Sequence, residues 1–234
     1  MFKRFNDLTE DDINCDLQIH TNRTDGQAGI EEIVNRARQI GLKRIAFTEH
    51  VRKDTDWFNE FADEIEEVRR RTGGIEIYIG CETKILNVHG TLDVSERILD
   101  RCEIILGSVH RFPDGAGGYL DFTWITEDDF SRMEFELASA LLLYAPIDVL
   151  AHPGGMYARH HGNFPQNLLA ELLELSKKRN VAVELNASYL KDIKTVLPVY
   201  REINPYVSIG SDVHRLEELG LCRDSLRLLG VGRS

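Results

Sequence analysis

Histidine and acidic side chains recur in this chain directly after short apolar runs, where strands are expected to end. Seven such residues and one glutamine stand at six of these positions: Gln18, His20, His50, Glu82, His110, His152, Asp212 and His214. Imidazole and carboxylate together form the ligand set that proteins use for zinc, iron or manganese. One carboxylate can bridge two metal ions, as hydrolytic two-metal sites require. The residue types therefore predict a metal centre that activates water for hydrolysis.

Clustering, more than any single residue, supports this interpretation. A lone histidine after a strand is more often a cap or a hydrogen-bonded core residue than a metal ligand. Here five histidines and two carboxylates follow successive strands at equivalent positions. Such a set predicts a shared site.

The first of these segments, residues 14–21, has the sequence NCDLQIHT. Strand side chains alternate between two faces, so Gln18 and His20 are expected to share a polar face with Asp16. The intervening residues are apolar or small and suit packing under helices. The segment is therefore expected to form one wall of the metal centre.

The runs that would position these side chains alternate between strand and helix. Strands are expected at 14–21, 44–48, 75–80, 103–108, 147–151, 181–185 and 206–210. Helices are expected at 29–40, 57–71, 94–100, 130–144, 166–178 and 193–203, the last with Pro198 as an irregularity, and in two short C-terminal pieces. This alternation predicts an α/β fold with parallel strands and its site at their carboxyl ends. We expect residues 1–234 to form one domain, with loops at 112–129 and 154–165 setting specificity.

Composition restricts the class of partner. The chain has 234 residues and a net charge of −11, from 28 basic and 39 acidic residues. This charge argues against nucleic acid as the main partner, because phosphate backbones select basic surfaces. No apolar run approaches the ~18 residues of a membrane span, and the start MFKRFNDLTEDD does not resemble a signal peptide. A cytoplasmic protein with reduced cysteines is expected, and the oligomeric state stays open.

The motifs DLQIHT, TDG, FTEH, GCE, GSVH, AHPG and GSDVH resemble those of the polymerase and histidinol phosphatase (PHP) superfamily. Their order and spacing match from residue 14 to residue 214. The stretch CETKILNVHGTLDV is most similar to stand-alone, histidinol-phosphatase-like phosphoesterases. The resemblance implies a distorted (β/α)7 barrel, similar to a TIM barrel.

The resemblance also implies two or three divalent metal ions: zinc, manganese or iron. It assigns the first ion to His20, Glu82 and Asp212, with Gln18 where the family usually has histidine. It assigns the second to Glu82, His110 and His152, and the third to Asp25, His50 and His214. An amide oxygen is a weaker ligand than imidazole for such metals, so the first ion is expected to be loose, absent or a harder ion.

The implied reaction is hydrolysis of a small phosphate ester, more plausibly a monoester, by a metal-bound hydroxide. Glu82 and Asp212 are the expected catalytic carboxylates. Arg159 and Arg111 are the preferred phosphate-binding residues, because a guanidinium fork matches phosphate oxygens. Three further arginines and two histidines follow motifs and are weaker candidates: Arg23, Arg52, Arg215, His160 and His161.

Two other functions remain open at this point. The chain is alternatively a metal-binding but non-catalytic PHP module whose site is weakened at Gln18. Hydrolysis of a bond other than a phosphate ester is the third option, disfavoured by the motifs.

Overall fold

The computed structural model describes residues 1–189 and 193–233, and its centre is one strongly curved sheet. Eight strands lie in the order β1-β8-β7-β6-β5-β4-β3-β2 in the described residues. Their bounds are β1 Lys3–Arg4, β2 Cys15–Ile19, β3 Arg44–His50, β4 Glu76–Lys84, β5 Ile104–Ser108, β6 Val149–Leu150, β7 Ala182–Asn186 and β8 Tyr206–Gly210. All neighbours from β2 to β8 are parallel, and β1 runs antiparallel to β8.

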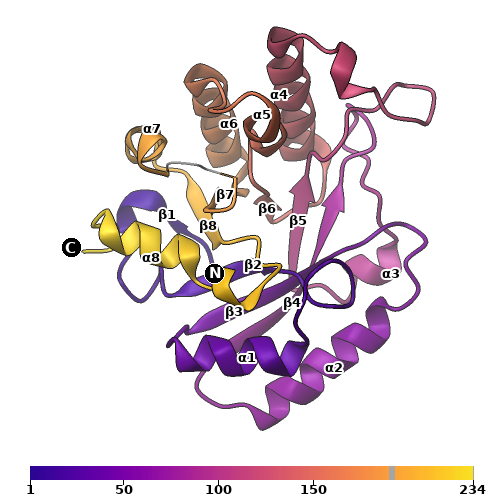
Figure 1. Ribbon diagram of the computed structural model, residues 1–234. Coiled ribbons are helices and arrows are strands. Elements are labelled where there is room, and N and C mark those ends of the chain that lie inside the picture. Colours follow the sequence, from indigo (N-terminus) through magenta and orange to yellow (C-terminus); the bar gives the residue numbers. More distant parts are fainter. Residues whose placement is uncertain (190–192, 234) are drawn as a thin grey trace.

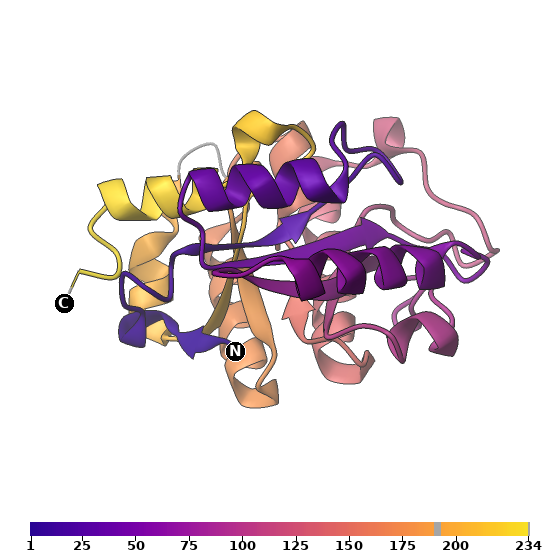
Figure 2. The ribbon, with the colours of Figure 1, turned by 90° about the horizontal axis from the view of Figure 1, so that it is seen from below.

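The segment after β8 closes this sheet into a barrel by returning to β2. His20 donates its backbone N–H to the carbonyl of Val213 at 2.9 Å, and Val213 donates to the carbonyl of Gln18 at 3.1 Å. The buried carboxylate of Asp16 accepts from the backbone N–H groups of Ser211 at 2.9 Å and Gly220 at 2.8 Å. The seven parallel strands and their closure confirm the distorted (β/α)7 barrel (Figures 1 and 2).

Helices cover the outside of the barrel, and five of them form two groups. The helix bounds are α1 Ile30–Gln39, α2 Phe58–Arg71, α3 Glu96–Leu99, α4 Glu127–Tyr144, α5 Gly155–His160, α6 Gln166–Arg179, α7 Leu197–Ile203 and α8 Leu221–Leu228. In Figure 1, α1 and α2 lie together along the flank of β3 and β4, and α4, α5 and α6 gather beside β5 to β7. Apolar side chains pack between each group and the strands, which fixes the strand ends relative to one another.

Several boundaries differ from those expected from the sequence. Strands β3 and β4 extend through His50 and Glu82, because both segments pair in register to their ends. Pro198 is the second residue of α7. In the first turn of a helix the backbone N–H groups have no partner within the helix, so proline is tolerated there and does not interrupt α7. The expected loop 154–165 contains the short helix α5, and α4 begins at Glu127, where Thr126 caps it. Among the described residues, no helix has the length and apolarity to cross a bilayer.

Candidate metal centre

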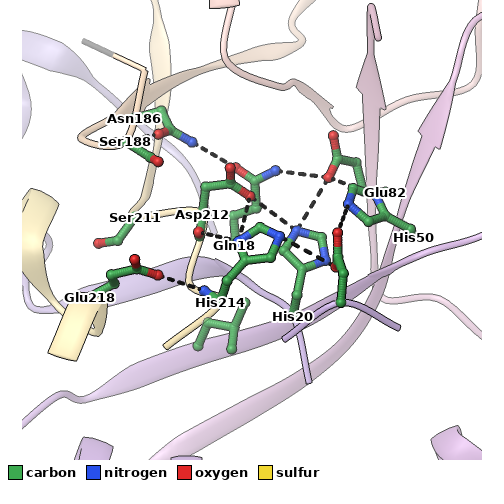
Figure 3. A network of polar contacts seen from close by, with 12 residues as sticks. Gln18, His20, His50, Glu82, Asn186, Ser188, Ser211, Asp212, His214 and Glu218 are labelled. Atoms are coloured by element: carbon green, nitrogen blue, oxygen red, sulfur yellow. Dashed lines mark hydrogen bonds and ion pairs between the residues drawn. The ribbon is translucent and has the colours of Figure 1, made fainter. Parts of the chain in front are cut away.

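The carboxylate of Glu82 lies at the centre of the candidate site and is only 1% exposed. Its Oε1 is 2.9 Å from Nε2 of both His110 and His152. Its Oε2 lies 3.3 Å from His20 Nε2, 3.3 Å from His50 Nδ1 and 3.1 Å from Gln18 Nε2. Side chains from four strands or the residues just after them therefore converge on one buried acid. Figure 3 shows three of them, Gln18, His20 and His50, around Glu82.

Two further carboxylates complete the cluster. Asp212 Oδ1 is 3.1 Å from His20 Nε2. Asp25 bridges two imidazoles, 3.4 Å from His50 Nε2 and 3.3 Å from His214 Nε2. Each of three groups has ligand atoms within 4.8 Å of one another: His20, Asp25, His50 and His214; His50, Glu82 and His110; and His20, Glu82 and Asp212. The nine residues expected as ligands are thus brought to one place, with His152 and Gln18 joined to the cluster through Glu82.

The strand ends place these side chains, and the backbone is strained where it must turn sharply. His50 and Glu82 are direct register partners in neighbouring strands, so their side chains meet. His152 has φ 25° and Asp212 has φ 50°, unusual values for residues with a side chain. Such strain costs of order 1–3 kcal/mol per residue and concentrates at functional sites.

A buried carboxylate that sequence reasoning did not single out, Glu49, holds the turn that presents Asp25. Glu49 accepts hydrogen bonds from the backbone N–H and hydroxyl of Thr21 and from the hydroxyl of Thr24. Gly26 lies so close to this turn that a Cβ there would be 2.3 Å from the carbonyl oxygen of His20. The turn therefore requires glycine at this position, which explains the TDG motif.

Neighbouring groups of opposite charge shift the pKa values of His20 and Glu82 strongly. Burial lowers the pKa of His20, but the close carboxylates of Asp212 and Glu82 outweigh it and hold that pKa well above its usual value. Burial raises the pKa of Glu82, but the charges of His110 and His50 hold it well below its usual range. The two pKa shifts favour the charged forms of His20 and Glu82, which therefore form a buried ion pair.

The donor set fits metal ions. Both ring nitrogens of His20 are buried and make no hydrogen bond, although carboxylate oxygens lie within 3.3 Å of Nε2. A buried polar atom without a hydrogen bond is rare and calls for a partner such as an ion. Imidazole with bridging carboxylate is the chemistry that zinc, manganese and iron prefer.

The comparisons with known proteins agree with this geometry. Residues 16–188 match the family model of the PHP domain. The chain belongs to the PHP domain family. It is 25% identical over 209 residues to a "probable phosphatase" of Caldicellulosiruptor saccharolyticus, covering 86% of this chain and 79% of that protein.

Two other PHP proteins show the range of the family. The chain is 26% identical over 216 residues to the DNA polymerase/3'-5' exonuclease PolX of Bacillus subtilis, covering 88% of this chain but only 35% of PolX. The structure of histidinol phosphate phosphatase (HisK) of Lactococcus lactis, complexed with zinc, L-histidinol and phosphate, superposes with a TM-score of 0.74. That match has 20% identity and covers 92% of this chain and 91% of HisK, so it shows a shared fold.

An open cavity of about 350 Å³ is lined by several of the candidate metal ligands. Arg111 and Arg159 both line it, together with Asp25, His50, His110, Phe122, Met156, Tyr189, Asp212 and His214. Arg23 and Arg215 instead pair with Glu64 and Glu218. His160 and His161 pack their rings against Phe130 and are not part of this lining.

Sequence reasoning missed the residues that hold Arg159 in place. The Arg159 guanidinium lies 4.4 Å from the centroid of the Tyr189 ring, and Tyr189 stacks on His152 at 4.3 Å. Glu134 in α4 accepts from the first turn of α5, at 3.0 Å from Met156 N and 2.7 Å from Tyr157 N. These contacts join residues far apart in the chain, and no local pattern signals them.

Proposed function

We propose that this protein is a metal-dependent phosphoesterase that hydrolyses a small phosphate monoester. One observation carries the proposal: each of the three groups of potential metal ligands contributes at least one side chain to a cavity that two guanidinium groups also line. Two or three divalent ions would be held there by His20, Asp25, His50, Glu82, His110, His152, Asp212 and His214. Ions at such positions lower the pKa of bound water and neutralise phosphoryl oxygens.

The protein's own residues would divide the remaining work between them. Arg159 and Arg111 would bind the phosphoryl oxygens, because a planar guanidinium donates two parallel hydrogen bonds to them. Glu82 and Asp212 would keep the histidines in place and in their required orientations. Tyr189 would hold Arg159 over the cavity and, with Phe122 and Met156, exclude water from one side of it.

The named relatives support a monoester substrate. One is described as a probable phosphatase and another as a histidinol phosphate phosphatase with bound zinc. We propose zinc, manganese or iron as the metal, and we propose that residues 1–234 act as one hydrolase unit. The cytoplasmic location expected from the sequence stays a prediction.

A direct test is phosphate release. Purified protein loaded with Mn²⁺ or Zn²⁺ is incubated with a panel of phosphate monoesters and diesters, and inorganic phosphate is measured. We expect turnover of at least one monoester, and a His20→Ala variant as control should lose it. No release from any ester by metal-loaded protein would refute the proposal.

The alternative is a non-catalytic module whose metal site is weakened because residue 18 is glutamine. The side-chain oxygen of Gln18 accepts a hydrogen bond from Asn186. Gln18→His separates the two functions. Activity that appears only in this variant would favour the non-catalytic module, whereas activity in the wild type excludes it.

A further inference from the structure

The side chain of Gln18 lies between Glu82 and Asn186 at the base of the metal cluster. Its Nε2 donates to Glu82 Oε2 at 3.1 Å, and its Oε1 accepts from Asn186 Nδ2 at 2.8 Å. Gln18 is fully buried and Asn186 is 1% exposed, so neither amide has water as an alternative partner. Figure 3 shows the three side chains in a row.

The orientation of Asn186 is fixed by its own turn. Its Oδ1 accepts from the backbone N–H of Ser188 at 2.8 Å and of Tyr189 at 3.3 Å. Backbone N–H groups can only donate, so the oxygen must face them. The Nδ2 group must therefore face the other way, toward Gln18 and toward Glu184 Oε2 at 3.2 Å.

The orientation of Asn186 in turn determines that of Gln18. An Nδ2 donor requires an acceptor opposite it, so Oε1 of Gln18 faces Asn186. The Nε2 group is left facing the carboxylate of Glu82, which accepts it. If the Gln18 amide were reversed, its Nε2 would face the Nδ2 donor of Asn186 and its Oε1 would face the carboxylate of Glu82. Both hydrogen bonds would be lost in a buried site, where unmade hydrogen bonds are costly.

We propose that Gln18 is a positioning residue for Glu82 and not a metal ligand. Its oxygen, the only atom of an amide that binds such metals, is engaged by Asn186. The group of His20, Glu82 and Asp212 then offers three protein ligands, which is the number that open catalytic zinc sites use. Histidine at position 18 would add a ligand, whereas glutamine adds a hydrogen-bond donor to the bridging carboxylate.

This inference rests on the proposed metal-dependent function, but its test does not require turnover. The protein and its variants are loaded with Co²⁺, whose visible absorption responds to its ligands, and metal per chain is measured by elemental analysis. Gln18→Met is close in shape and has no amide. We expect it to keep the wild-type metal count and an unchanged Co²⁺ spectrum, while kcat on a phosphate monoester falls roughly 10- to 100-fold and KM is unchanged.

The controls establish what a lost ligand and a neutral change look like. His20→Ala should alter the spectrum and lower the metal count, and Gln39→Met on the exposed end of α1 should change neither. If Gln18→Met alters the spectrum or loses an ion as His20→Ala does, Gln18 is a ligand and the inference is wrong.

Asn186→Asp tests the orientation independently. The new side chain still accepts from Ser188 and Tyr189 but offers no donor to Gln18, so the Gln18 amide should reverse and turn Oε1 toward the cluster. We expect an altered Co²⁺ spectrum that Gln18→Met in the same protein reverts. An unchanged spectrum in Asn186→Asp contradicts the inference. If the wild type binds metal and hydrolyses no ester, the proposed function fails while these spectral results still decide the role of Gln18.

Discussion

Gly210→Ala is the substitution for which the structure makes the sharpest stability prediction. Gly210 is the last residue of β8. A Cβ at this position would lie 2.0 Å from Glu184 Oε1 and 2.9 Å from Gln18 Cβ. Real contacts of this kind are longer than 3.0 Å, so one neighbour must move.

Neither neighbour moves easily. Glu184 is 1% exposed and accepts from His152 N at 2.8 Å and Asn186 Nδ2 at 3.2 Å. Weakening both hydrogen bonds costs about 1–3 kcal/mol. Overpacking a close-packed interior costs a further ~1–3 kcal/mol. The lower entropy of the unfolded chain returns about 0.4–1 kcal/mol, so a net loss of roughly 1–6 kcal/mol is expected.

The assay is denaturant unfolding, with Gly29→Ala as the matched control. A Cβ at Gly29 would meet only Asn22 Nδ2, at 3.9 Å, and its φ of −84° suits any residue. That variant should stay within about 1 kcal/mol of the wild type. If Gly210→Ala is as stable as Gly29→Ala, the close packing of Glu184 and Gln18 around β8 is not as described.

Three further predictions concern the site and its supports. Removing metal with a chelator should abolish ester hydrolysis and lower the melting temperature, because a ligand that binds only the folded state stabilises it. Adding Mn²⁺ or Zn²⁺ should restore the activity and the original melting temperature. An unchanged melting temperature after chelation would argue against bound metal. Burial raises the pKa of Glu134 to about 7, so between about pH 4.5 and 7 the folded state keeps a proton that the unfolded state releases. The stability of the wild type relative to Glu134→Gln should therefore fall as pH rises through this window. A constant difference between the two proteins in denaturant unfolding from pH 4.5 to 8 would contradict this prediction. Arg159→Lys should lower kcat/KM for a phosphate monoester by 10-fold or more, because lysine lacks the planar fork of a guanidinium. The control Arg215→Lys changes a surface arginine that pairs with Glu218 and should leave kcat/KM unchanged. Equal effects of the two substitutions would show that Arg159 does not bind the substrate.

Much of the barrel and the cluster follows from local patterns. The alternation of strands and helices, and the polar residues at the strand ends, predict that His20, Glu82 and Asp212 meet, since parallel strands present their carboxyl ends together. The pairing of His50 with Glu82 follows from the same rule.

The supporting contacts could not be predicted in this way. The orientation of Gln18 depends on Asn186, which lies 168 positions away. The capping of α5 depends on Glu134, 22 positions from Met156. The two residues of β1 are too few to show any periodicity. Each contact is chosen by packing in three dimensions, which a local pattern does not record.

Closure of the barrel between β2 and the segment after β8 has a consequence for folding. His20 and Asp212, which meet at 3.1 Å, are 192 positions apart. At a synthesis rate of about 5–20 residues per second, Asp212 is synthesised roughly 10–40 s after His20, which follows β2. His20 and Asp212 therefore come together last, as the barrel closes. The group of His20, Glu82 and Asp212 is therefore completed only when the barrel is closed.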